Sequence, residues 1–206
     1  MTAAPERSPE RDAAIRATLP LVPEAGWTRA ALRLGMAAAG TDPLDADLLF
    51  PRGPLDMIEA WADLADRDME AGAATAGIAE LRLSQRVRAV VALRLRQSRN
   101  DREAVRRALA VLATPGHAAL ATRITARTVD AMWHAAGDRS ADFSWYSKRA
   151  ILAAIYAVTL LFWLRDASDD DADTLAFLDR RLAGLGRVAR LRQRVAAKLP
   201  GGSQPA

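Results

Sequence analysis

The spacing of the prolines is the strongest constraint on what this chain can fold into. Prolines occupy positions 5, 9, 20, 23, 43, 51, 54, 115, 200 and 205, so the intervals 55–114 and 116–199 contain none. Proline breaks a helix interior because it lacks a backbone N–H and its ring clashes with the preceding turn. Within both intervals apolar residues recur every three or four positions, and no run alternates as a strand would. We therefore predict an all-α protein of about nine helices.

Composition excludes several classes of protein. Half of the 206 residues are apolar and 26% are charged, which is the balance of a globular protein with a sizeable core. The longest candidate for an apolar run, 151–164, has 14 residues and is interrupted by Tyr156 and Thr159, whereas a membrane-spanning helix needs ~18 consecutive apolar residues. No cysteine is present, so disulfides and cysteine-ligated metals are excluded. The acidic N-terminal residues do not form a secretory signal or a transit peptide, and we expect a cytoplasmic protein.

Charge is segregated along the chain. Residues 41–70 carry nine acids and two arginines, whereas seven basic residues and no acid follow Asp179. Segregated charge indicates partners better than net charge does. We therefore expect the two ends of the chain to have different partners.

Residues 11–54 are predicted to form short helices at about 11–19, 28–39 and 43–50, with a turn at Gly40. This arrangement of short helices and a turn is typical of a helix-turn-helix. The strings GWTRAALRLGMAAAG and LLFPRGPLDMI also resemble the N-terminal part of tetracycline-repressor-type regulators. The second helix of the motif carries Asp42, Asp45 and Asp47 and no basic residue. DNA affinity comes from neutralising phosphates, so we interpret 11–54 as a degenerate motif without a nucleic-acid partner. The alternative is a ligand-responsive transcription regulator.

Residues 55–179 are predicted to form the body, with helices at about 55–70, 78–96, 101–113 and 116–136. Apolar side chains on these helices could belong to a packed core or to the wall of a lipid cavity. The candidate cavity residues are Met57, Trp61, Leu64, Val90, Met132 and Ile155.

The string FSWYSKR at 143–149 begins a helix that is apolar on nearly every face. Trp145, Tyr146, Lys148 and Arg149 cannot all point inward, and exposed aromatics beside charges are typical of interface hot spots. In the alternative, Trp145 packs against the preceding helix.

Four strings together carry a family resemblance that covers roughly residues 20–185. They are VDAMWHAAGDRSADFSWYSKRAILAAIYAVTLL, TLAFLDRRL, GWTRAALRLG and FPRGPLDMI, and they resemble the lipid-binding accessory family of ubiquinone biosynthesis, the ninth protein of the coenzyme Q series. The resemblance implies a tetracycline-repressor-like homodimer that catalyses no reaction. It further implies that the protein binds an isoprenoid or quinone lipid and helps the di-iron hydroxylase of the pathway reach its substrate. The family's partner-binding patch would fall on Asp142, Trp145, Tyr146 and Arg149.

The segment 180–199 combines an apolar stripe with basic residues, as a helix lying in a membrane interface does. We expect it to hold the protein peripherally on the inner membrane, through Leu185, Arg187, Val188, Leu191, Arg192, Val195 and Lys198. The alternatives are an amphipathic helix packed on the domain with a solvated basic face, and a nucleic-acid tail, which lacks aromatics for base stacking.

Other candidate sites are weaker. Asp130, His134, Asp138 and Asp142 recur at four-residue spacing, but Gly137 should end the helix, and no second histidine accompanies them. The sequence contains no motif for a phosphate-binding loop or a catalytic triad. With two histidines and no cysteine, we expect neither an enzyme nor a metal site, and no cofactor beyond a bound lipid.

Overall fold

The computed structural model describes residues 5–138 and 144–196, and these residues contain ten α-helices, two of them only four residues long, and no strand. The prediction of an all-α protein with about nine helices is confirmed. The α-helices are α1 (Pro9–Thr18), α2 (Val22–Ala25), α3 (Arg29–Ala38), α4 (Ala46–Leu49), α5 (Pro54–Thr75), α6 (Leu83–Gln97), α7 (Arg102–Leu112), α8 (Ala118–Ala135), α9 (Ser144–Trp163) and α10 (Ala172–Ala196). Short 3-10 turns join them at Leu19–Leu21, Pro43–Asp45, Ile78–Glu80, Arg99–Asp101, Pro115–His117 and Asp169–Asp171.

Helix boundaries follow local sequence signals. The side chains of Ser8 and Thr28 accept hydrogen bonds from the first turns of α1 and α3, as N-cap residues do. Gly53 has a φ of 60° immediately before Pro54 begins α5, and Gly137 has a φ of 74° after the end of α8. Both glycines adopt a left-handed conformation that other residues rarely tolerate, so the chain turns sharply at these positions.

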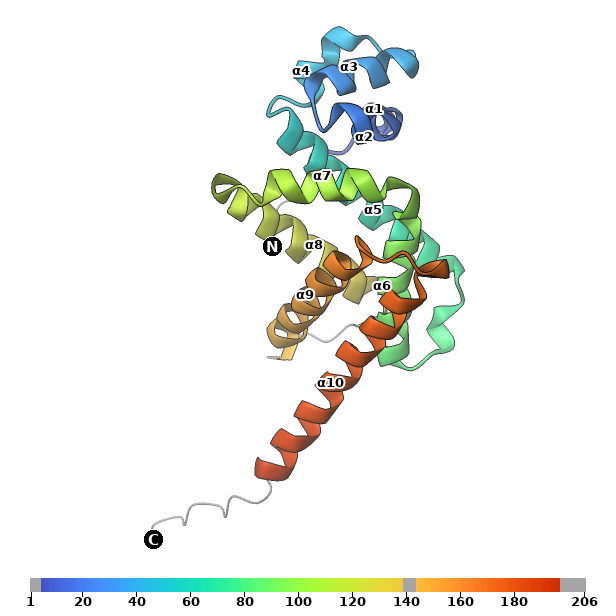
Figure 1. Cartoon of the computed structure of the whole chain (residues 1–206), viewed down its shortest axis with the longest axis vertical. Coiled ribbons are helices and arrows are strands. Elements are labelled where there is room, and N and C mark those ends of the chain that lie inside the picture. Colours follow the sequence, from blue (N-terminus) through green and yellow to red (C-terminus); the bar gives the residue numbers. More distant parts are fainter. Residues whose placement is uncertain (1–4, 139–143, 197–206) are drawn as a thin grey trace.

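Helices α1–α4 gather at one end of the molecule (Figure 1). Helices α1 and α3 approach closely because Gly35 lies against the backbone of Thr18, where a Cβ atom would come within 2.9 Å. Trp27 joins this part to the rest of the protein. Its indole N–H donates to the carbonyl of Ala104 over 3.0 Å, and its ring centroid lies 5.2 Å from that of Trp61.

In the body, α5 packs along α8, and α6 and α9 complete a core of fully buried side chains that includes Ile58, Val90 and Met132. Helix α10 is fixed to this core by buried Leu178 and by the stacked rings of Phe162 and Phe177, whose centroids are 4.6 Å apart. Beyond these contacts α10 extends away from the body (Figure 1). The helix is continuous across residue 180, so the basic segment prolongs α10 instead of starting a helix of its own.

Most acids of the stretch 41–70 pair with arginines of the same chain. Its carboxylates accept hydrogen bonds from arginines on other segments: Asp47 from Arg33, Glu59 from Arg123, Asp63 from Arg7, Asp66 from Arg94 and Asp68 from Arg16. The charge segregation seen along the sequence therefore does not translate directly into an acidic surface for a partner. Folding brings arginines from remote positions onto these acids.

Candidate functional site

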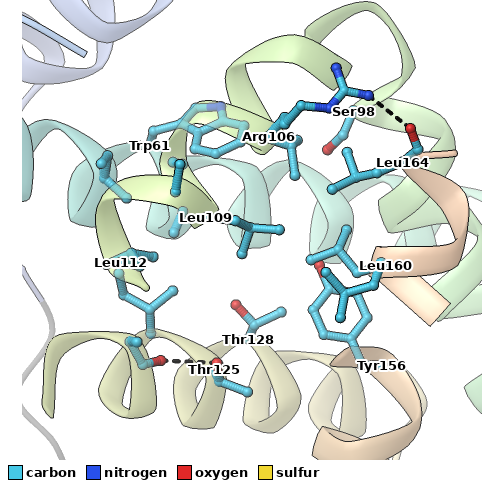
Figure 2. Close-up of a pocket in the computed structure, with 18 of the residues that line it drawn as sticks. Trp61, Ser98, Arg106, Leu109, Leu112, Thr125, Thr128, Tyr156, Leu160 and Leu164 are labelled. Carbon is cyan, nitrogen blue, oxygen red and sulfur yellow. Dashed lines mark hydrogen bonds between the residues drawn. The ribbon is translucent and has the colours of Figure 1, made fainter. Parts of the chain in front are cut away.

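A cavity of about 570 Å³ lies between α5, α6, α7, α8 and α9 (Figure 2). This volume is in the range of small-molecule binding sites. Trp61 on α5 and Tyr156 on α9 lie on opposite sides of the cavity (Figure 2). Most of the wall is apolar and is contributed by Ile58, Leu95, Val105, Leu109, Leu112, Ile124, Leu160 and Leu164.

Helix α7 supplies much of this wall because its apolar residues share one face. Val105, Ala108, Leu109 and Leu112 are spaced by three, one and three positions and all line the cavity. Side chains at such spacings lie on the same side of an α-helix. An apolar molecule held against this face is removed from water by walls of similar polarity.

One region of the wall is polar. There the Arg94 guanidinium lies among side chains from α5 and α6, with its Nε 3.2 Å from a carboxylate oxygen of Asp66 and one Nη donating to the Ser98 hydroxyl over 2.6 Å. The Thr128 hydroxyl donates to the other Asp66 oxygen over 2.8 Å. Asp66, Arg94, Thr128 and Tyr156 are all buried. A buried ion pair of this kind is held in place only when its remaining hydrogen-bonding groups are also satisfied.

Burial and neighbouring charges shift the pKa values in this polar region. Burial raises the pKa of the Asp66 carboxyl, although Arg94 and Thr128 oppose that shift. Burial also raises the pKa of the Tyr156 phenol, with the positive charge of Arg94 opposing it. Tyr156 is therefore a neutral hydroxyl that can donate a hydrogen bond.

The lining residues Arg106 on α7 and Leu161 on α9 are exposed to solvent, and we take this side as the mouth of the cavity. The Arg106 guanidinium donates to the carbonyl of Leu164 over 2.8 Å at this mouth (Figure 2). Arg106, Leu161 and Leu164 also belong to a second hollow, a groove of about 740 Å³ that continues along α9 to Phe162 and Phe177. The cavity and the groove therefore adjoin one another at these three residues.

Of the six residues predicted from sequence to line a lipid cavity, Trp61 lies on its wall. Met57, Leu64, Val90, Met132 and Ile155 are buried in the core, outside the set that lines the cavity. Sequence reasoning missed most of α7 and the polar residue Arg94. The spacing of apolar residues on α7 was a usable signal, but nothing in the sequence pointed to Arg94. As lipid contacts, the six residues remain a prediction.

The predicted partner-binding patch lies at the start of α9. Tyr146 is 74% exposed there, and Arg149 donates to Asp130 of α8 over 2.7 Å. Asp142 lies outside the described residues, and Trp145 begins α9 with a side chain that is not among those described. The described part of the patch thus includes an exposed aromatic ring beside an ion pair between α8 and α9.

The predicted membrane-binding residues fall at the end of the chain. Leu185, Arg187, Val188, Leu191, Arg192 and Val195 belong to the backbone of α10, with side chains outside the described part, and Lys198 lies outside the described residues. Among the residues that the structure describes, no helix is long and apolar enough to cross a membrane.

The column of acids and histidine on α8 is engaged in separate contacts. His134 Nδ1 lies 3.0 Å from a carboxylate oxygen of Glu70, and Asp138 lies 3.7 Å from the Lys148 ammonium. Within 5–138 and 144–196, no three potential metal ligands come together.

The chain is similar to known proteins over most of its length. The COQ9 family model matches residues 118–189. The mitochondrial ubiquinone biosynthesis protein COQ9 of Rattus norvegicus is 34% identical over 174 residues, which are 82% of this chain and 56% of that protein. Its counterpart in Homo sapiens is also 34% identical, over 82% of this chain and 55% of that protein.

A solved structure supports the fold. A TetR transcriptional regulator from Nitrosomonas europaea superposes with a TM-score of 0.68 and 26% identity, over 85% of this chain and 97% of that one. The predicted tetracycline-repressor-like fold is therefore confirmed. This chain spans a little over half the length of the curated relatives it matches. Its sequence matches and its fold together show that it belongs to the COQ9 family of ubiquinone biosynthesis proteins.

Proposed function

We propose that this protein is a lipid-binding accessory protein of ubiquinone biosynthesis that catalyses no reaction itself. The cavity between α5 and α9 holds an isoprenoid or quinone lipid, and the protein presents that lipid at a membrane surface to a hydroxylase of the pathway. The observation that carries the proposal is the cavity of about 570 Å³ with its mostly apolar wall. The membership in the COQ9 family supports the pathway.

Burial of a prenyl tail supplies the driving force for binding. Each CH₂ group removed from water contributes about 0.8 kcal/mol, so one five-carbon unit contributes about 4 kcal/mol before ordering costs. A tail that leaves the cavity beside Leu161 would reach the adjoining groove at Phe177, so several units could be covered.

Filling the cavity tests lipid binding directly. Ala121 lies on the cavity side of α8, whereas Ala126 is exposed on the same helix. We expect Ala121→Trp to remove most of the prenyl lipid that co-purifies with the protein, as measured by mass spectrometry of organic extracts. Ala126→Trp is the matched control and should retain the lipid. Absence of prenyl lipid from the unmodified protein would contradict the proposal.

The exposed start of α9 is the proposed surface for the hydroxylase. We expect Tyr146→Ala to weaken capture of the hydroxylase in a pull-down. The ring of Tyr146 is exposed to solvent in the free protein, and aromatic rings that become buried in an interface contribute much of its binding energy. Tyr146→Phe keeps the ring and should retain most of the binding. Equal capture by all three proteins would place the hydroxylase elsewhere.

The end of α10 is the proposed membrane contact, made by a homodimer. Basic residues near an anionic surface contribute about 1 kcal/mol each, so Arg187→Glu with Arg192→Glu should reduce co-flotation with anionic liposomes. High salt should reduce flotation of the unmodified chain in the same way. Flotation that is unchanged by both treatments would exclude this contact.

A ligand-responsive regulator is the second candidate, favoured by the TetR-family structure that superposes on this chain. The face around α4 opposes it, since Leu44 and Leu48 are 84% and 79% exposed beside the acidic residues Asp42 and Asp45. The neighbouring Arg29 and Arg33 are paired with Asp47, so this face offers phosphates little net positive charge. We expect no shift of genomic DNA fragments in a gel assay, and a salt-sensitive shift would favour the regulator.

A further inference from the structure

The polar region of the cavity lies at its inner end. Arg94, Thr128 and Tyr156 are buried, whereas Arg106 and Leu161 at the mouth are exposed. A molecule with one polar and one apolar end can enter in two orientations. The placement of hydrogen-bonding groups along the cavity distinguishes the two.

Most polar groups at the inner end already have partners inside the protein. The Thr125 hydroxyl donates to the carbonyl of Ala121 over 2.9 Å, and the Thr128 hydroxyl donates to Asp66. The Ser98 oxygen accepts from Arg94.

Two hydroxyl groups have no acceptor for their protons among the described residues. Across 5–138 and 144–196, no protein atom accepts a hydrogen bond from the hydroxyl of Ser98 or of Tyr156. The Tyr156 hydroxyl is directed toward the cavity (Figure 2). Hydroxyl groups inside a protein normally find a partner, so a ligand that carries oxygen acceptors would satisfy them.

The charge at the inner end selects against an ionised head group. The positive charge of Arg94 is balanced by Asp66, which lies 3.2 Å away. A phosphate or carboxylate head would bring an additional negative charge close to Asp66, where Arg94 is already paired, and unpaired buried charge is costly. An uncharged oxygen acceptor adds no such cost.

We propose that the cavity takes its lipid head first, with an uncharged oxygen-bearing ring at the inner end and the apolar tail leaving through the mouth. Carbonyl or methoxy oxygens of the ring accept hydrogen bonds from the hydroxyls of Tyr156 and Ser98. The tail passes Arg106, Leu161 and Leu164 into the groove that ends at Phe177. This inference rests on the proposed lipid-binding function and adds the class of head group and its orientation.

The opposite orientation is disfavoured by the chemistry of the mouth. Its cationic side chain, Arg106, is engaged by Glu103 and by the carbonyl of Leu164. The neighbouring groove offers Val158, Phe162 and Phe177 to a hydrocarbon tail, beside the charged residues Arg165, Asp166 and Asp173. A head group at the mouth would also leave the inner hydroxyls unsatisfied.

The test compares two probes of equal tail length on the full chain. Decylbenzoquinone carries ring carbonyls and decylbenzene does not, and both are measured by displacement of the neutral dye Nile red. A hydrogen bond contributes about 0.5–1.5 kcal/mol, so we expect Tyr156→Phe to weaken the binding of decylbenzoquinone by about two- to tenfold. Decylbenzene binding should change less than twofold. Ser98→Ala is the second variant, with the same pattern expected.

Each other outcome has a defined meaning. If the two variants bind both probes equally more weakly, or bind both probes as the unmodified protein does, the head-first assignment is overturned while lipid binding stands. Failure of both probes to displace the dye from the unmodified protein would overturn the proposed function as well. Decyl phosphate provides the charge test, because tighter binding of this anion than of decylbenzoquinone would contradict a neutral head group.

Discussion

Glu59 is the ionic link between α5 and α8, and its removal should weaken the whole fold. The carboxylate is only 4% exposed. It accepts hydrogen bonds from Arg123 over 3.0 Å, from Arg127 over 2.9 Å and from Arg52 over 2.7 Å. The substitution Glu59→Gln keeps the shape of the side chain and removes its charge. Three arginines are then left close together without their shared anion.

The magnitude follows from the pKa of Glu59. Burial raises this pKa, but the hydrogen bonds from Arg123, Arg52 and Arg127 outweigh burial and lower it from 4.5 to about 2. At 1.36 kcal/mol per unit, this difference corresponds to at most about 3.4 kcal/mol. The Arg52 side chain is 53% exposed, so solvent screens part of the interaction. We expect Glu59→Gln to lower the free energy of unfolding by about 2 kcal/mol at pH 7.

The pH dependence provides a second signature. Because the folded pKa of Glu59 lies below the unfolded one, its stabilisation is complete above about pH 4.5 and is lost as the pH falls toward 2. Linkage predicts that roughly 40% of the contribution is gone at pH 3.5. The difference in the free energy of unfolding between the unmodified protein and Glu59→Gln should therefore be smaller at pH 3.5 than at pH 7.

Urea unfolding followed by circular dichroism at the two pH values measures this gap. Glu80→Gln is the control, because Glu80 is exposed and has no ion pair within the described residues. It should unfold like the unmodified protein at both pH values. A Glu59→Gln variant as stable as the control at pH 7, or a gap that stays constant at pH 3.5, would refute the electrostatic reasoning.

Two further predictions concern close packing and the buried ion pair. Gly35→Ala should lower the free energy of unfolding by about 1–3 kcal/mol, because its Cβ would lie 2.9 Å from the backbone of Thr18. Gly116→Ala, whose Cβ would meet no neighbouring group within 4 Å, should be neutral. Calorimetric melting that ranks the two variants equally would contradict this. Asp66→Asn should cost about 3–5 kcal/mol by leaving Arg94 buried without its counter-charge. Replacing the pair together, with Asp66→Leu and Arg94→Met, should recover most of that loss in urea unfolding, and no recovery would argue against charge as the cause.

Local signals in the sequence predicted most helix boundaries. Helix α3 begins after its cap Thr28, in agreement with the helix predicted at about 28–39, and Gly137 follows the end of α8 as expected, because caps and left-handed glycines depend on only a few neighbouring residues. Two boundaries within 55–113 differ from prediction. Helix α5 continues to Thr75, since no proline or glycine turn interrupts it before Gly77, and α6 begins at Leu83 after a 3-10 turn.

The sequence by itself thus determined the fold class, the helices and the family. Spacing of apolar residues shows that a helix has a buried face, but it does not show whether that face meets a core or a cavity. Only packing decided that Trp61 and the apolar face of α7 line the cavity while Met57 and Met132 fill the core. Packing also brought Arg94 to Asp66 and Tyr156, which are 28 and 62 residues away along the chain. Contacts between such distant positions form only when five helices come together, so local patterns could not predict the polar end of the cavity.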